Sequence, residues 1–325
     1  MDQDPELAFR ELREFLDKRI IGQSALNLRL LVALLADGHL LVEGAPGLAK
    51  TTAVKTLAAA LEGDFHRIQF TPDLLPGDLT GTEIYRPQEG EFHFQRGPLF
   101  HNLLLADEIN RAPAKVQSAL LEAMAERQIT VGKNTYGLPR LFLVMATQNP
   151  IEQEGTYPLP EAQLDRFLLY VRIGYPEREA ERGILAIARE EARSNGKPTV
   201  DTPPLVLSQS SLFHARQHVL DTYMADNVET YLLELVAASR DPSPYDQDLP
   251  ARIRYGASPR AAIALDRCSR AHAWLAGRDF VSPEDVQTIA PDVLRHRVLL
   301  SYEALADGWD TDDVVRRLLE RVPAP

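Results

Sequence analysis

The chain has 325 residues and a mass of 36.3 kDa, the size of two packed domains. Hydrophobic residues make up 45% and charged residues 25% of it, which excludes a disordered chain. A net charge of -12 disfavours non-specific nucleic-acid binding, and a single cysteine excludes an internal disulfide and a cysteine-built metal site. The N-terminus is acidic and no apolar run reaches membrane-spanning length, so we expect a cytoplasmic protein without a membrane span.

The first half of the chain alternates helical periodicity with short apolar runs, a rhythm typical of a parallel sheet covered by helices. The expected helices are residues 5–19, 23–36, 50–62 and 114–126. The candidate strands are residues 39–43, 65–70, 102–107, 140–147 and 167–173. These runs lack strict alternation, as expected for strands buried on both faces. The sequence therefore predicts an α/β core over residues 1–177.

Two segments interrupt this rhythm. Residues 71–97 are rich in proline and glycine and predict an inserted hairpin, and residues 128–138 predict a second one. From residue 177 the pattern becomes wholly helical, with a linker by composition at residues 197–204. A helical second domain is expected over residues 178–325, with helices at 210–224, 227–239, 259–276, 282–297 and 312–321.

A glycine-rich motif follows the first candidate strand and opens a helix. It reads Gly44-Ala45-Pro46-Gly47-Leu48-Ala49-Lys50-Thr51 and is a phosphate-binding loop in the required context. Lys50 would reach the β- and γ-phosphates of ATP, and Thr51, followed in the same helical turn by Thr52, would ligate Mg²⁺. The usual pattern has glycine where Ala49 stands, and a small residue suffices there if the backbone keeps helical angles. A plain glycine turn before a helix is the alternative.

Two adjacent acids end the apolar strand at residues 102–107. Asp107 can hold Mg²⁺ at the carboxyl end of the strand, and Glu108 can polarise the attacking water. Strands often end in solvated acids, so the pair indicates a metal ligand and a base only because a phosphate-binding loop precedes it in a parallel-sheet pattern. Asn149 ends the next strand and could orient the water, although an asparagine before Pro150 is also a common turn residue.

Five segments occur in order: Gly-Ala-Pro-Gly-Leu-Ala-Lys-Thr, Leu-Ala-Asp-Glu-Ile-Asn-Arg-Ala, Ala-Thr-Gln-Asn-Pro, Leu-Pro-Glu-Ala-Gln-Leu-Asp-Arg-Phe and Gly-Ala-Ser-Pro-Arg-Ala. Together they resemble the MoxR family of AAA+ ATPases over nearly the whole chain. The family pattern commonly has Ala-Lys in its phosphate loop, as here. The resemblance implies a P-loop AAA+ core with two hairpin insertions and an all-helical lid.

The resemblance also implies roles for single residues. Asn149 would be the sensor that positions water, and Arg166 the arginine finger that reaches the γ-phosphate of a neighbouring subunit. Arg260 would be the second sensor, reaching from the lid to its own nucleotide, and Ile21 would pack near adenine. Arg111 has two possible interpretations, a second contact to the neighbouring subunit or a local ion pair. A surface or ion-paired arginine is the alternative for Arg166 and Arg260.

The function implied is a Mg²⁺-dependent ATPase that forms a ring, of six subunits by resemblance, and remodels or activates client proteins. A partner with a von Willebrand factor A domain, and a role in cofactor or metal insertion, are implied by the resemblance alone. A nucleic-acid motor is one alternative, disfavoured because residues 71–97 carry five acidic and two basic side chains. A non-catalytic ATP-dependent assembly switch is the other, disfavoured by the presence of Glu108 and Arg166.

Overall fold

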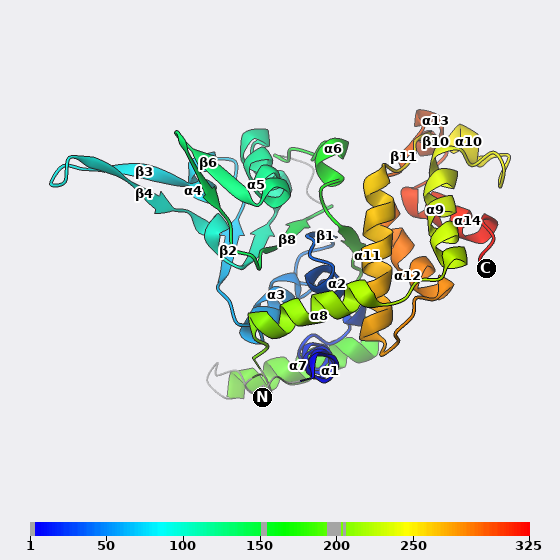
Figure 1. Cartoon of the computed structure of the whole chain (residues 1–325), viewed down its shortest axis with the longest axis horizontal. Coiled ribbons are helices and arrows are strands. Elements are labelled where there is room, and N and C mark those ends of the chain that lie inside the picture. The colour runs from blue at the N-terminus through cyan, green and yellow to red at the C-terminus, as the bar shows by residue number, and fades with distance from the viewer. Residues whose placement is uncertain (1–3, 151–154, 194–202, 204–205) are drawn as a thin grey trace. The chain divides into compact units, whose positions relative to one another are not determined.

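The computed structural model describes residues 4–150, 155–193, 203 and 206–325, which fall into two compact units (Figure 1). The first unit comprises Met1–Leu31, His39–Arg166 and Val171–Ser211, and the second comprises Val32–Gly38, Phe167–Tyr170 and Leu212–Pro325. The linker predicted at residues 197–204 lies outside the described residues except for Pro203. The domain boundary predicted after residue 177 stays a prediction.

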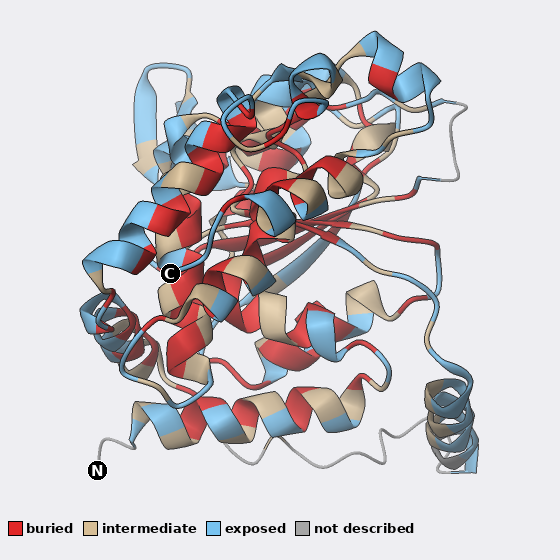
Figure 2. Cartoon of the chain, turned by 90° about the vertical axis from the view of Figure 1, so that its right-hand side faces the viewer, coloured by how far each residue is buried: buried red, intermediate tan, exposed pale blue. Residues whose placement is uncertain are grey.

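A five-stranded sheet forms the centre of the α/β fold. Its spatial order is β2-β5-β8-β1-β9, and the pairs β2–β5, β5–β8 and β8–β1 are parallel. The strands are β1 Leu40–Glu43, β2 Phe65–Gln69, β5 Leu103–Asp107, β8 Leu143–Gln148 and β9 Leu169–Arg172. Every residue of β5 is buried, as its unbroken Leu-Leu-Leu-Ala run predicts, and Figure 2 shows the strands largely in the buried colour. The predicted α/β fold is confirmed.

The register of the sheet aligns the polar ends of four strands. Gln69 of β2 pairs with Asp107 of β5, and Glu43 of β1 pairs with Gln148 of β8. Because these strands are parallel, their carboxyl ends meet at one edge of the sheet. The acidic and amide side chains that end the apolar runs therefore gather at that edge.

Helices accompany this sheet along the chain. They are α1 Pro5–Arg19, α2 Ser24–Leu35, α3 Lys50–Ala59, α5 Ala114–Glu126, α6 Glu161–Leu164 and α7 Arg178–Arg193, with 3₁₀ turns η1 Pro98–Phe100 and η2 Ile109–Arg111. Helix α1 begins where Asp4 accepts a hydrogen bond from the Glu6 N–H and proline occupies its first position. It buries one stripe of side chains, from Ala8 to Leu16.

Both predicted hairpins are present. They are formed by β3 Gly81–Arg86 with β4 Glu91–Arg96, which projects at the left of Figure 1, and by β6 Gln128–Val131 with β7 Asn134–Gly137. Phe94 and Tyr136 stack with ring centroids 4.2 Å apart and join the two hairpins. The first insertion is not purely a hairpin, because it opens with the short helix α4 Pro76–Thr80, whose Leu79 is fully buried. Proline at a first helical position and the Asp78 capping contact start this helix.

The second unit is mostly helical. Its elements are α8 Gln209–Asp221, α9 Asp226–Arg240, α10 Leu249–Arg252, α11 Pro259–Leu275, α12 Pro283–Leu294, α13 Tyr302–Ala306 and α14 Thr311–Arg321. The expectation of a wholly helical second half is wrong in one place, since β10 Ile253–Tyr255 pairs antiparallel with β11 Leu299–Leu300. These strands are too short for periodicity to reveal them.

One buried ion pair fixes the start of α12. Asp285 accepts hydrogen bonds from Arg278, at 2.5 and 2.7 Å, from the His272 ring at 2.6 Å, and from both the backbone and the hydroxyl of Ser282. Ser282 and Asp285 form a capping box at the start of this helix, and proline occupies its first position. Among the described residues, no helix combines the length and apolar character needed to cross a bilayer.

Candidate active site

The glycine-rich motif lies between β1 and α3, in the predicted strand–loop–helix context. At Gly47 the backbone is left-handed, with φ of 82°, and an added Cβ would have no atom within 4 Å. At Gly44 an added Cβ would lie 2.4 Å from a side-chain carbon of Ile173. Gly44 therefore permits close packing, whereas Gly47 permits the turn of an open loop.

Ala49 departs from the backbone geometry assumed for it. It precedes α3 with φ of 58° and ψ of 16°, the left-handed region, so ordinary helical angles at this position are wrong. The usual glycine there has a conformational reason, and alanine costs about 1 kcal/mol in this geometry. The first intrahelical bond runs from the Ala53 N–H to the Ala49 carbonyl, which leaves the N–H groups of the first helical turn directed out of the helix.

Lys50 is directed into the loop. Its Nζ donates to the Gly44 carbonyl at 2.5 Å. Burial lowers the pKa of Lys50, and the carboxylates of Asp107, Glu108 and Glu43 oppose that shift. The structure thus brings the loop lysine and the two predicted acids into one electrostatic neighbourhood. Glu43 joins them, a residue that the sequence did not single out.

Asp107 is held from two sides. Thr147 donates its hydroxyl to one carboxylate oxygen at 2.6 Å, and Arg67 donates Nη2 to the other at 2.6 Å. Only 11% of the Asp107 side chain is exposed, whereas 46% of Arg67 is. The carboxylate is therefore oriented by a neutral donor on the next strand and balanced by a guanidinium at the surface.

Glu108 occupies a left-handed turn, with φ of 58° and ψ of 49°, immediately after β5. Its N–H donates to the Thr147 hydroxyl at 2.9 Å, so a single threonine contacts both adjacent acids. Its carboxylate accepts from Gln69 at 2.7 Å and from Arg111 at 3.0 Å. Arg67 donates both to Asp107 and to the Gln69 side chain, so the β2 residues link the two carboxylates, and Arg111 forms a local ion pair with Glu108 within the chain.

Asn149 directly follows β8 and is 5% exposed. Beside it, Gln148 donates to Glu43 at 2.9 Å, and Arg172 lies 3.4 Å from the same carboxylate. Sequence reasoning missed Thr147, Gln69 and Arg67 as well as Glu43. A signal exists for Glu43 and Thr147, which are polar residues at or near the carboxyl ends of otherwise apolar strands, whereas β2 is polar at three of its five positions and does not mark Arg67 or Gln69.

The donor set fits nucleotide-bound Mg²⁺ rather than a protein-built metal cage. In the described part of the chain, no three His, Cys, Asp or Glu side chains gather as metal ligands. Magnesium in phosphate-transfer sites takes one or two protein oxygens and completes its shell with phosphate and water. Thr51 is half-buried in the first turn of α3 and Asp107 ends β5, and their role as ligands of such a magnesium ion stays a prediction.

Arg166 and Ile21 lie in the first unit. Arg166 follows α6 and donates Nη1 to the Leu121 carbonyl of α5 at 3.0 Å, while its side chain stays part-exposed. Ile21 lies in the turn after α1, where an added Cβ at Gly183 of α7 would be 2.9 Å from its Cδ1. The helix that follows the sheet thus packs on the segment expected near adenine. Their nucleotide contacts stay predictions.

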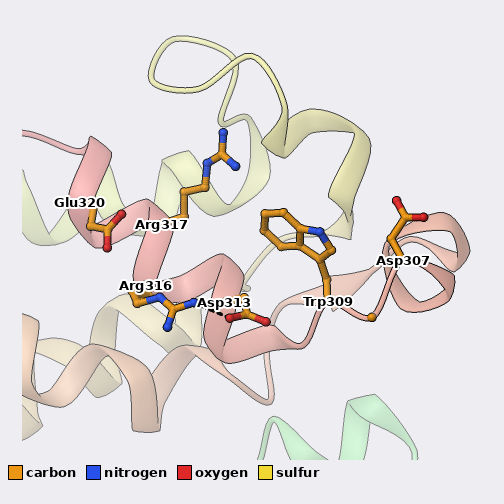
Figure 3. A pocket seen from close by; sticks show the side chains of 7 residues that line it. Asp307, Trp309, Asp313, Arg316, Arg317 and Glu320 are labelled. Atoms are coloured by element: carbon orange, nitrogen blue, oxygen red, sulfur yellow. Dashed lines mark hydrogen bonds and ion pairs between the residues drawn. The ribbon is translucent and has the colours of Figure 1, made fainter.

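Arg260 belongs to the second unit, exposed in the first turn of α11, and its sensor role stays a prediction. The same unit has a surface hollow of about 410 Å³ around Trp309 (Figure 3). The two arginines lining it are already paired, Arg316 with Asp313 and Arg317 with Asp246. Three acidic side chains also line the hollow, so it offers no phosphate site.

The chain is similar to ATPases of known family. Residues 39–169 match the ATPase family associated with various cellular activities (AAA), and residues 250–318 match the AAA lid domain. "Chaperone MoxR1" of Mycobacterium tuberculosis is 46% identical over 94% of this chain and 79% of its own length. "Protein MoxR" of Methylorubrum extorquens is 33% identical over 95% and 92%.

A solved structure from Cytophaga hutchinsonii, described as that of a candidate ATPase, has a TM-score of 0.89 and 45% identity. It covers 99% of this chain and 97% of the solved one. The sequence matches, the parallel central sheet and the phosphate-binding loop all indicate the same family of ATPases. The chain belongs to the MoxR family of AAA+ ATPases.

Proposed function

We propose that this protein hydrolyses ATP with Mg²⁺ in a ring of identical subunits and uses the cycle to remodel client proteins. The observation that carries the proposal is the sheet topology: the loop with Lys50 follows β1 and the acids Asp107 and Glu108 end β5, so the parallel strands bring them to the same edge of the sheet. Hydrolysis of a phosphoanhydride bond needs a cation that binds the phosphates, a carboxylate that holds Mg²⁺ and a group that orients the attacking water, and these three residues can supply them.

The residues divide the chemistry between them. The N–H groups at the start of α3 and Lys50 hold the phosphates, and Thr51 and Asp107 hold the metal. Bound Mg²⁺ would neutralise charge on the β- and γ-phosphates. The Glu108 carboxylate accepts a hydrogen bond from the attacking water and acts as its general base, and Asn149 orients that water. Gln69 and Arg111 also donate to the Glu108 carboxylate, so the attacking water competes with these two side chains for it.

Arg166 is assigned to the neighbouring subunit's nucleotide. The Arg166 guanidinium donates to the Leu121 backbone carbonyl, a neutral acceptor that binds a guanidinium less strongly than a phosphate does. Arg260 is assigned to the subunit's own nucleotide from the lid. Six subunits are the ring size that the family resemblance implies.

Client remodelling rests on two features. Relatives of this chain carry the MoxR name, and one of them is called a chaperone. The β3–β4 hairpin exposes Ile84, Tyr85 and Phe92 beside acidic side chains, a surface suited to protein rather than to nucleic acid. A von Willebrand factor A domain partner and a role in cofactor or metal insertion remain implied by resemblance alone.

The decisive experiment is steady-state ATPase activity against protein concentration, with Mg²⁺, for the wild type and Arg166→Ala. We expect specific activity to rise with concentration in the wild type and to be lost in the variant, because the finger is supplied by a neighbour. Lys133→Ala, at the exposed tip of the second hairpin, is the matched control and should keep full activity. A rate independent of concentration, or unchanged in Arg166→Ala, overturns the shared site.

A further inference from the structure

Helix α5 lies between the two halves of the proposed active site. Its N-terminal half contacts the turn that carries Glu108, and its C-terminal half contacts Arg166. In the proposed ring these two residues act on different nucleotides, Glu108 on the subunit's own and Arg166 on the neighbour's. The inference below rests on that proposed function.

Gln117 is the polar member of the buried stripe of α5. Its exposure is 0%, among the apolar side chains Val116, Leu120, Leu121 and Met124. Its Nε2 donates to the Ile109 carbonyl at 3.2 Å and to the Tyr157 carbonyl at 2.9 Å. Ile109 is the residue after Glu108, and Tyr157 precedes α6 and Arg166 in the chain.

The same two segments are also bonded directly. The Tyr157 N–H donates to the Asn110 carbonyl at 2.6 Å. Gln117 and this backbone bond therefore clamp residues 109–110 to residue 157. The left-handed turn at Glu108 has its geometry fixed immediately downstream by this clamp.

The same turn of α5 also contacts the segment that ends in Arg166. The Ser118 hydroxyl accepts from Gln163 of α6 at 3.2 Å, and the Leu121 carbonyl accepts from Arg166 at 3.0 Å. Gln117, Ser118 and Leu121 are neighbours on one helical turn. A rigid helix thus joins the turn of the base to the segment of the finger.

This arrangement leaves one polar atom of Gln117 unsatisfied. Its Oε1 is buried and has no hydrogen-bond partner among the described residues. An apolar side chain of similar length would fill the place without an unsatisfied acceptor. The glutamine is therefore explained by its two donor bonds rather than by packing.

We infer that α5 is a strut that couples each subunit's own base to the finger it offers its neighbour, and that Gln117 is the positioning residue of this coupling. Loss of the clamp lets the Glu108 turn and the Arg166 segment shift independently. Displacements of this kind near reacting groups reduce turnover by about tenfold or more.

The test uses subunits that are inactive alone and complement each other. Glu108→Gln lacks the base but keeps the finger, and Arg166→Ala lacks the finger but keeps the base. Mixing them before ATP is added places intact fingers beside intact bases and should recover turnover. No recovery overturns the shared site of the proposed function, before Gln117 is involved at all.

Gln117→Met is then added to one partner at a time. The strut predicts that recovered turnover falls about tenfold whether the change is in the base-keeping or the finger-keeping subunit. Met124→Leu, on the same buried stripe, removes no hydrogen bond and is the control. Unchanged recovery, or a loss confined to either one of the two subunits, overturns the inference. The ATP affinity and melting temperature of each subunit separate positioning from misfolding.

A second pair of variants removes the other half of the clamp. Tyr157→Pro deletes the N–H that donates to Asn110, and Tyr157→Ala keeps it. The Tyr157 side chain is 45% exposed, so neither change opens the core. We expect the proline variant to reduce recovered turnover in both positions and the alanine variant to leave it within twofold. Equal recovery in the two variants contradicts the strut.

Discussion

Arg67 binds a single oxygen of Asp107 through two nitrogens, Nε at 3.1 Å and Nη2 at 2.6 Å. The arginine comes from β2, and its register partner on β5 lies two residues before Asp107. The same carboxylate is the one assigned to Mg²⁺. A guanidinium therefore contacts the carboxylate to which the metal is assigned, and the two cations would compete for it.

Removing this competitor should ease metal binding. For Arg67→Ala we expect the Mg²⁺ concentration that gives half-maximal ATPase activity to fall about two- to fivefold, since a half-exposed ion pair contributes roughly 0.5–1 kcal/mol. A magnesium titration at saturating ATP measures this. Arg86→Ala removes a surface ion pair on the β3–β4 hairpin and should change nothing. A higher Mg²⁺ requirement in Arg67→Ala would mean that the arginine orients Asp107 for the metal instead.

Lys50→Ala should reduce ATP affinity by at least about a hundredfold, because it removes a cation that is directed into the phosphate-binding loop. Binding of a fluorescent ATP analogue measures the effect without depending on turnover. Lys55→Ala, exposed on the same helix, is the charge-matched control. Wild-type affinity in the Lys50 variant would refute the phosphate-binding assignment.

Ala49→Gly should stabilise the protein by about 0.5–1 kcal/mol, because glycine relieves the left-handed backbone at φ of 58°. Urea unfolding monitored by circular dichroism gives the free energy. Ala58→Gly, in the same helix at ordinary helical angles, should instead destabilise by about 1 kcal/mol. If both variants lose stability alike, the left-handed geometry at residue 49 is not maintained in solution.

Asp285 should make the stability of the lid region depend on pH. Burial alone would raise the pKa of Asp285, but hydrogen bonds from Arg278, His272 and Ser282 outweigh it and hold the pKa far below its ordinary value. A carboxyl with a depressed folded-state pKa stabilises the fold above its unfolded pKa, about 3.9, and loses that contribution as pH falls through the folded pKa.

Asp285→Asn should therefore destabilise the protein by about 3 kcal/mol at neutral pH, and the difference from wild type should shrink below about pH 4. Denaturant unfolding at a series of pH values tests this. Asp279→Asn, an exposed acid on the same connection, should stay within about 0.5 kcal/mol of wild type. A difference that is constant between pH 3 and 7 would contradict the linkage.

The elements that could be predicted are those specified by residues adjacent in the sequence. The limits of α1 and α5 match the expected ranges, because apolar periodicity and clear terminal residues specify each helix by itself. The phosphate-binding loop was predictable for the same reason, since its strand, glycines and helix are contiguous. The antiparallel pair β10–β11 was not, because it joins residues more than forty positions apart through only two or three residues each.

The same distinction applies to the candidate site: residues in contiguous motifs were predictable, and residues brought together by strand pairing were not. Lys50, Asp107 and Glu108 belong to short motifs, so the sequence revealed them. Thr147 and Arg67 act through spatial register between strands, which no spacing along the chain specifies. Ala49 shows a third case: its identity was known, but its left-handed backbone is set by the path of the loop and by the helix it must start.

The stack between Phe94 and Tyr136 has a consequence for experiments on motion. The two hairpins enter the chain about forty residues apart, yet the parallel rings tie them at 4.2 Å into one arm. A spectroscopic label placed on the tip of either hairpin should report the same movement during the ATP cycle. Phe94→Ala would separate the two signals and show which hairpin responds to the nucleotide first.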